Sequence, residues 1–207
     1  MNMKYAAAVS VMFLSLTSAM SAGNDSAPDT SKLRLIRVPM TRQATDYTCG
    51  VAAVQSLLGY YGEDAREREL YAELQPDSKM GTNTHNIAAL FRKRGFEVAV
   101  TTGALLSDLK KALDDAKPVI VTIQAWGDKP DYTKEWEDGH FAVAIGYDKK
   151  NIYFMDPSTL GHYTYIPSAE FLARWHDYEK EGKLIRFMLT ASKNAPVYNP
   201  DRILRME

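Results

Sequence analysis

Cysteine is almost absent from this sequence: Cys49 is the single one among 207 residues, which excludes an intramolecular disulfide. A charge imbalance is also lacking, because 25 basic and 26 acidic residues give a formal net charge of -1 with no long run of either sign. A nucleic-acid partner is therefore not indicated. Long apolar runs are missing too. The most apolar stretch, residues 5–16, is about a dozen residues, well short of the roughly 20 that span a bilayer.

The N-terminus nevertheless has the pattern of a secretory signal peptide. Residues 1–4 are short and basic, residues 5–16 are mostly apolar, and residues 17–23 are rich in small side chains. We predict a signal peptide over residues 1–22, hence a periplasmic or secreted protein with no stable membrane span after signal removal. An uncleaved anchor is the alternative. Exported proteins normally have paired cysteines or none, so a retained single thiol indicates either a buried residue or a reactive one.

The remaining chain is long enough for one domain with a full hydrophobic core. We expect a polar linker over residues 23–34, the domain over residues 35–191 and a C-terminal tail over residues 192–207. No internal repeat or low-complexity block divides the domain.

Within the domain, apolar residues change from helical spacing to the alternation of strands. Helices are predicted at residues 49–61, 67–74, 83–94, 107–114 and 168–178, and strands at residues 33–38, 96–101, 118–125, 140–147, 152–155, 163–166 and 184–190. Residues 126–139 are polar, aromatic and irregular, and this segment is long enough to form a functional loop. Because helices come first and strands follow, the sequence predicts an α+β domain with N-terminal helices packed on an antiparallel sheet.

Cys49 lies at the predicted start of the first helix, where a nucleophile would be placed. Free N–H groups and the partial positive charge of a helix N-terminus stabilise a thiolate, which is the reactive form of cysteine. The alternative is a small buried hydrophobic residue, as most free cysteines are.

A cysteine nucleophile needs a base, and His140 is the best candidate. It opens a predicted strand directly after the irregular loop, so its ring can lie at the edge of a cleft on a rigid support. The other histidines are poorer candidates: His85 is near a helix start, His162 is in a turn, and His176 is on a charged helix. A structural or surface role is the alternative for His140 as well.

Two further residues could complete the site. Asp156 ends the return strand of a predicted hairpin, so it could lie beside His140 and orient the imidazole. Asp-Pro is also a common turn signal, and capping of its own turn is the alternative for Asp156. Gln43 lies in the loop that leads to Cys49. Its side-chain N–H could join the backbone N–H of Cys49 as an oxyanion hole.

The irregular loop before His140 carries three aromatic candidates for substrate binding: Trp126, Tyr132 and Trp136. Aromatic side chains there could bind an extended peptide. They could equally form a packed lid, because aromatic residues are common in both settings.

In this order and at these spacings, the residues resemble the bacteriocin-processing cysteine peptidases, family thirty-nine of the papain-like clan. The resemblance covers roughly residues 36–189 and rests on Gln43 and Cys49-Gly50 at a helix start, Asp138-Gly139-His140 at a strand start and Asp156-Pro157 at the next strand end. Gly81-Thr82, followed by a helix and then Gly95-Phe96, is similar to the middle of that family in a less specific way.

The resemblance implies a papain-like cysteine peptidase fold, thiol chemistry on a peptide bond, and no metal or organic cofactor. By position, Cys49 would be the nucleophile, His140 the base and acid, Asp156 the orienting residue and Gln43 the oxyanion donor. Typical members are N-terminal domains of peptide exporters that cut after a double-glycine leader. The predicted signal peptide here indicates instead a stand-alone exported member. We expect it to act on a secreted or envelope peptide or protein, with a secretion system as a candidate partner.

Two other classes of function stay open. Another papain-like acyl-transfer enzyme, such as an amidase, a deamidase or a transglutaminase-like protein, would use the same three residues on a different amide. A non-catalytic peptide-binding domain could keep the same shape, although loss of one of the three residues would then be expected, and none is lost.

Overall fold

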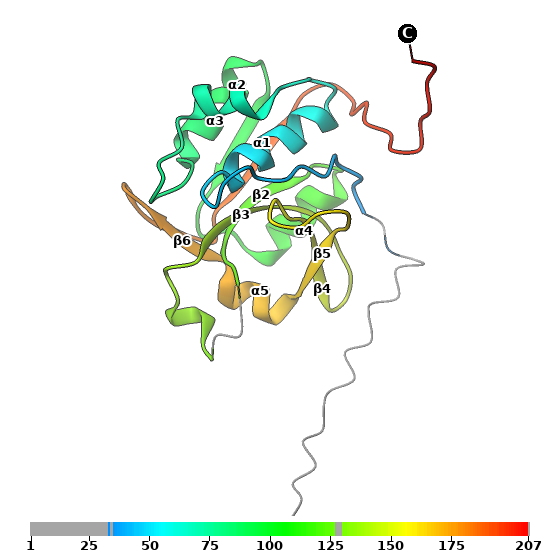
Figure 1. The fold of residues 1–207 in the computed structure, drawn as a ribbon. Coiled ribbons are helices and arrows are strands. Elements are labelled where there is room, and N and C mark those ends of the chain that lie inside the picture. The colour runs from blue at the N-terminus through cyan, green and yellow to red at the C-terminus, as the bar shows by residue number, and fades with distance from the viewer. Residues whose placement is uncertain (1–32, 34, 127–129, 207) are drawn as a thin grey trace, which may run out of the picture. The chain divides into compact units, whose positions relative to one another are not determined.

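The computed structural model describes residue 33, residues 35–126 and residues 130–206 (Figure 1). These residues belong to one compact unit, residues 31–207. The predicted signal peptide and most of the predicted linker lie outside the described residues, and so do residues 127–129 of the irregular loop.

Three helices come first along the domain, and the strands follow with single helices between some of them. The helices are α1 (Cys49–Tyr60), α2 (Glu67–Leu74), α3 (Thr84–Lys93), α4 (Leu106–Asp114) and α5 (Ser168–Arg174), with a short 3-10 helix η2 (Tyr132–Lys134). The strands are β1 (Glu97–Thr101), β2 (Val119–Gln124), β3 (Gly139–Tyr147), β4 (Asn151–Met155), β5 (Thr164–Pro167), β6 (His176–Glu179), β7 (Gly182–Ile185) and β8 (Met188–Ser192). Among the described residues, no helix combines the length and apolar character that crossing a membrane would require.

Six strands form one sheet in the order β1-β8-β2-β3-β4-β5, and every neighbouring pair is antiparallel. Strands β6 and β7 form a separate two-stranded hairpin. Since β2 and β3 lie at the centre of the large sheet, both of their faces are covered, and β2 is buried along its whole length. The antiparallel sheet confirms the predicted α+β class.

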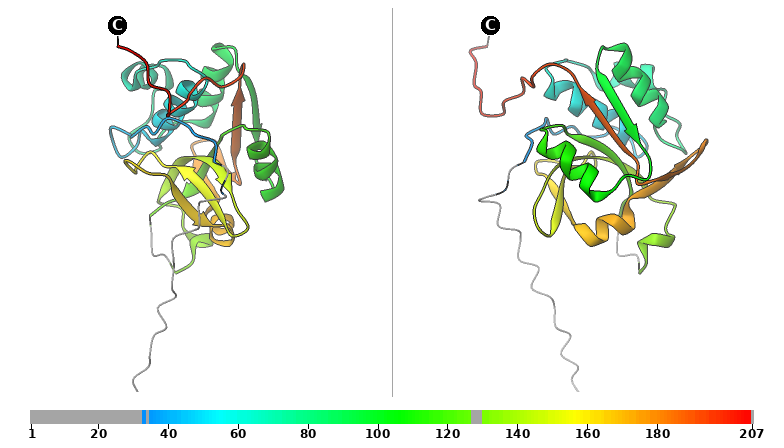
Figure 2. Two further views of the ribbon diagram at one scale, coloured as in Figure 1. Left: turned by 90° about the vertical axis from the view of Figure 1, so that its right-hand side faces the viewer. Right: turned by 180° about the vertical axis from the view of Figure 1, so that it is seen from behind.

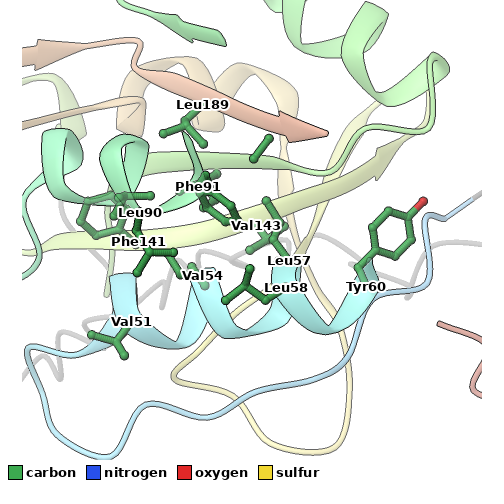
Figure 3. Close-up of a cluster of buried hydrophobic side chains, with 14 of the residues drawn as sticks. Val51, Val54, Leu57, Leu58, Tyr60, Leu90, Phe91, Phe141, Val143 and Leu189 are labelled. Atoms are coloured by element: carbon green, nitrogen blue, oxygen red, sulfur yellow. The ribbon is translucent and has the colours of Figure 1, made fainter. Parts of the chain in front are cut away.

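Helices cover both faces of the sheet, and the strand alternation divides the core in two. On one face, Val143 of β3 belongs to a cluster with Leu57 of α1 and Phe91 of α3 (Figure 3). Leu70 of α2 belongs to the same cluster. Helices α4 and α5 lie on the other face (Figure 2). Ala142 of β3 belongs to a cluster with residues of these two helices. The loop preceding α1 runs beside β3, where the backbone N–H of Ile36 donates to the carbonyl oxygen of Ile145 at 2.8 Å.

The structure corrects three predictions of secondary structure. Residues 33–38, predicted as a strand, contain no strand among their described positions. The last predicted helix is shorter than expected, because α5 ends at Arg174 and the chain then forms β6. The last predicted strand is two strands, β7 and β8, separated by a turn in which Arg186 adopts a positive φ of 48°. Trp175 explains the second error: it is buried on the same core face as Phe171, so its burial continues the apolar pattern of the helix after the helix has ended.

Candidate active site

Cys49 is the first residue of α1, and the fold buries it against the start of β3. Its side chain is 5% exposed, and its sulfur accepts a hydrogen bond from the backbone N–H of Phe141 at 3.5 Å. Gly50 permits this approach, because a β-carbon there would lie 2.6 Å from Cβ of Thr82 and 3.2 Å from the ring of Phe141. The start of α1 can therefore lie this close to Thr82 and Phe141 because residue 50 is a glycine.

The surroundings of Cys49 favour its ionised form. Burial raises the pKa of a thiol, but here the hydrogen bond and charge of His140 oppose burial, as do the N–H groups of Phe141 and Gly50. The pKa of the Cys49 thiol is consequently below its usual value. A thiolate with an imidazolium partner is the reactive form of such a pair.

His140 lies near the start of β3 with its ring almost fully buried, between Cys49 and Asp156. Its Nε2 is 2.8 Å from Oδ1 of Asp156, which leaves the other ring nitrogen, Nδ1, for proton exchange with Cys49. Burial lowers the pKa of a histidine, but hydrogen bonds and charges of Asp156 and Cys49 outweigh it and raise the pKa of His140 to about 9.

Asp156 is hydrogen-bonded both to His140 and within its own turn. Besides His140, Oδ1 accepts from the backbone N–H of Ser158 at 2.8 Å and from its hydroxyl at 2.7 Å, and Oδ2 accepts from the hydroxyl of Thr159 at 2.9 Å. Burial opposes ionisation, but His140 and the Ser158 donors hold the pKa of Asp156 well below its usual value. The contacts that both alternatives require are thus present in one carboxylate, and the orienting role of Asp156 stays a prediction.

Gln43 is in the loop before α1, and its backbone N–H donates to the carbonyl oxygen of Pro157 at 3.0 Å. Its side-chain Nε2 donates to the carbonyl oxygen of Thr45 at 2.7 Å, while Oε1 is buried without a hydrogen-bond partner among the described residues. The structure therefore ties Gln43 to the turn after Asp156. No hydrogen bond joins Gln43 to Cys49 in the described part of the chain, and its oxyanion role stays a prediction.

The three aromatic candidates of the loop have different surroundings. The ring of Trp126 is 5.3 Å from that of His140, and the residue is 51% exposed. Tyr132 stacks against the guanidinium of Arg174 at 3.9 Å, and Trp136 packs 4.5 Å from the ring of His176. Only Trp126 of the three borders the candidate site directly, and a substrate-binding role for each of them stays a prediction.

The remaining histidines lie elsewhere. His85 and His162 are exposed, and the Nε2 of His176 is 2.7 Å from the carbonyl oxygen of Glu135. In the part of the chain that the structure describes, no group of three or more His, Cys, Asp and Glu side chains could hold a metal ion.

A second buried carboxylate, Asp177, was missed by the sequence interpretation. It lies on β6, and its Oδ1 accepts from the backbone N–H of Tyr178 at 2.8 Å and from Nε2 of Gln124 at 3.3 Å. Burial raises the pKa of Asp177 to about 7. Asp177 was missed because the sequence predicts a surface helix over residues 168–178, where a charged side chain is expected to be exposed.

Comparison with solved structures places the fold among C39 peptidase domains. The peptidase domain of Streptococcus ComA matches with a TM-score of 0.57 and 18% identity, over 76% of this chain and 98% of that domain. A putative C39-like peptidase from Bacillus anthracis matches with a TM-score of 0.60 and 18% identity, over 79% and 98%. A double glycine motif protease from an AMS/PCAT transporter, solved with its leader peptide, matches with a TM-score of 0.52 and 20% identity, over 76% and 92%.

Comparison with curated protein sequences finds no match. The model of the Peptidase_C39 like family, in contrast, matches residues 35–183, which is most of the described domain. The mixed helical and antiparallel fold agrees with the papain-like architecture of the C39 peptidase domains. The chain belongs to the Peptidase_C39 like family.

Proposed function

We propose that this protein is a cysteine peptidase that uses Cys49, His140 and Asp156 as a catalytic triad. The observation that supports the proposal best is the continuous arrangement of the three side chains, from the sulfur through the imidazole to the carboxylate, with a lowered pKa at Cys49 and a raised one at His140. Perturbed pKa values of this kind are concentrated at functional sites.

In the proposed reaction, the Cys49 thiolate attacks the carbonyl carbon of a peptide bond. The carbonyl oxygen becomes an oxyanion, and the backbone N–H of Cys49 at the start of α1 and the amide of Gln43 would donate to it. When the intermediate collapses, the C–N bond breaks and protonated His140 gives its proton to the leaving amine. Water then attacks the thioester carbonyl while His140 takes up the proton of the water. The C–S bond breaks, which releases the carboxyl product and restores the Cys49 thiolate beside protonated His140.

We also propose that the enzyme acts outside the cytoplasm on a secreted or envelope polypeptide, with a secretion system as partner. The signal-like pattern of residues 1–22 supports export. One relative of similar fold is a double glycine motif protease bound to its leader peptide, which supports a peptide substrate in general terms. N-terminal sequencing of the protein from cell fractions tests the export proposal: a start between Met20 and Asn24 is expected, and an intact Met1 on cytoplasmic protein would refute it.

Peptidase activity can be tested with purified protein and a defined peptide library, using mass spectrometry to locate new termini. Cleavage by the wild type and none by Cys49→Ala is the expected result. His85→Ala is a matched control for His140→Ala, because His85 is exposed and remote in sequence from the three site residues. Release of ammonia from glutamine side chains without any new terminus would show an amidase or deamidase instead.

A further inference from the structure

A cavity of about 220 Å³ opens beside His140 and Asp156 on the sheet face that carries α5. Its floor is apolar and buried, formed by Ile123, Ala142 and Phe154, which are at most 4% exposed. Ile166, Trp126 and Tyr165 also line the cavity, and the last two are 51% and 39% exposed. A buried apolar floor below an exposed aromatic rim is the arrangement of a site that takes up an apolar group from solvent.

Among the described residues that line this cavity, Arg174 is the one charged side chain outside the triad, and its charge is already balanced. The guanidinium of Arg174 is 2.6 Å from Oε1 of Glu170 and stacks on the ring of Tyr132 at 3.9 Å. Arg174 is therefore held as part of the wall by α5 and the irregular loop. The chemistry that the cavity offers is mainly hydrophobic contact rather than recognition of an acidic group.

The position of the cavity relative to the triad decides which part of a substrate it could hold. Its wall contains His140 and Asp156, but neither Cys49 nor any other residue of α1. The oxyanion forms at the N-terminus of α1, whereas the leaving amine must lie next to His140 to receive its proton. A side chain in the cavity would therefore belong to the residue on the leaving-amine side of the scissile bond.

We propose that this cavity is a specificity pocket for an apolar side chain of the residue immediately after the scissile bond. The assignment rests on the proposed peptidase function and adds a substrate class to it: peptides with leucine, isoleucine, methionine or phenylalanine at that position. Its volume is smaller than the roughly 300–1,000 Å³ of pockets that hold a drug-sized ligand, which fits one side chain.

The pocket can be tested without a known substrate, by alkylation of Cys49 with iodoacetyl amino-acid amides. The sulfur displaces iodide from the CH₂ group, so labelling requires the thiolate but no peptide cleavage, and the amino-acid side chain is free to bind the pocket. Iodoacetyl-leucinamide should label wild-type Cys49 about tenfold faster than iodoacetyl-glycinamide, as burial of an aliphatic side chain predicts. Iodoacetyl-aspartamide should show no gain over glycine.

Variants in β5 then test the location. Thr164→Phe places a ring in the cavity from the edge strand and should bring the leucine-to-glycine rate ratio close to one. Thr101→Phe is the matched control, an exposed position on β1 at the opposite edge of the sheet, and should keep the wild-type ratio. Ile166→Ala enlarges the cavity and should shift the preference from the leucine probe toward iodoacetyl-phenylalaninamide. Thermal unfolding of each variant checks that it is folded.

The outcomes separate the two proposals. Equal labelling rates for the leucine and glycine probes, in wild-type protein that iodoacetamide labels rapidly at Cys49, would overturn the pocket and leave the peptidase proposal intact. A ratio that Thr164→Phe and Thr101→Phe change to the same extent would also overturn it. If plain iodoacetamide reacts with Cys49 no faster than with an ordinary buried thiol, the peptidase proposal fails and the pocket assignment fails with it.

Discussion

The backbone of Gly139 lies directly against the buried carboxylate of Asp177: a β-carbon at residue 139 would lie 2.4 Å from Oδ1 and 2.6 Å from Oδ2. Gln124 links the same two segments, since its Nε2 donates to Asp177 and to the carbonyl oxygen of His176, and its Oε1 accepts from the backbone N–H of Asp138. The β6–β7 hairpin therefore supports the two residues that precede His140.

We predict that Gly139→Ala destabilises the protein. The new methyl group would overlap the Asp177 carboxylate, and overpacking of this kind typically costs about 1–3 kcal/mol. Urea unfolding of the variant measures the loss. Repeating the substitution in an Asp177→Ala background is the control, because all the overlapping atoms are then removed and the cost should largely disappear. An equal cost in both backgrounds would place its origin in the backbone of residue 139.

Asp177→Asn should change the pH dependence of stability. The folded pKa of Asp177 is about 7, against about 3.9 for an aspartate in an unfolded chain. Between these values the folded state keeps a proton that the unfolded state releases, so the contribution of Asp177 to stability falls as pH rises from about 4 to 7.

The asparagine variant lacks this loss, so its stability relative to wild type should rise over the same range, by roughly 2–4 kcal/mol. Urea unfolding at pH 5 and pH 8 provides the comparison, with exposed Asp64→Asn as the control. A difference between wild type and variant that does not depend on pH would contradict a raised pKa at Asp177.

Alkylation of Cys49 by iodoacetamide should have a midpoint below the pH of about 8.5 that is usual for a free thiol, because His140 stabilises the thiolate. In His140→Ala the alkylation midpoint should move upward. An unchanged midpoint would show that the two side chains do not interact.

His140 keeps its proton until about pH 9, and its unfolded pKa is about 6.5. The charge of His140 therefore stabilises the fold fully below pH 6.5 and ceases to do so as pH rises through 9.

Asp156→Asn should lower turnover by roughly 10² to 10⁴, since the imidazole is still present but its orientation and charged form lose their support. The measurement is the cleavage rate of a library peptide that the wild type cuts. Ser158→Ala is a useful companion variant, because it removes one donor to Asp156 and leaves the contact with His140. Full activity in a folded Asp156→Asn protein would mean that Asp156 only caps its turn.

Gln43→Ala should lower turnover by about 10² to 10³, the usual effect of removing one donor to an oxyanion. Alkylation of Cys49 by iodoacetamide forms no oxyanion, so its rate should change far less. Loss of labelling together with turnover would indicate that the Gln43 side chain shapes the loop, through its bond to the carbonyl oxygen of Thr45, and the oxyanion role would be withdrawn.

The sequence by itself determined the elements whose signals are local. The helix at Cys49, the strand at His140 and the hairpin that ends before Asp156 all follow from apolar spacing and turn residues within short windows, and the structure confirms them. The helix positions Cys49, and the hairpin positions His140 and Asp156. The motifs around these three residues were therefore enough to predict the fold class of the domain.

Tertiary structure alone decided the features that depend on contacts between distant segments. The burial of Asp177, the tie between Gln43 and Pro157 and the different surroundings of Trp126 and Trp136 have no local signal in the sequence. Each of them depends on how the hairpin, the loops and the sheet pack together. The same packing brings Cys49, His140 and Asp156 together, and their mutual hydrogen bonds and charges outweigh the effect of burial on the pKa values of Cys49 and His140.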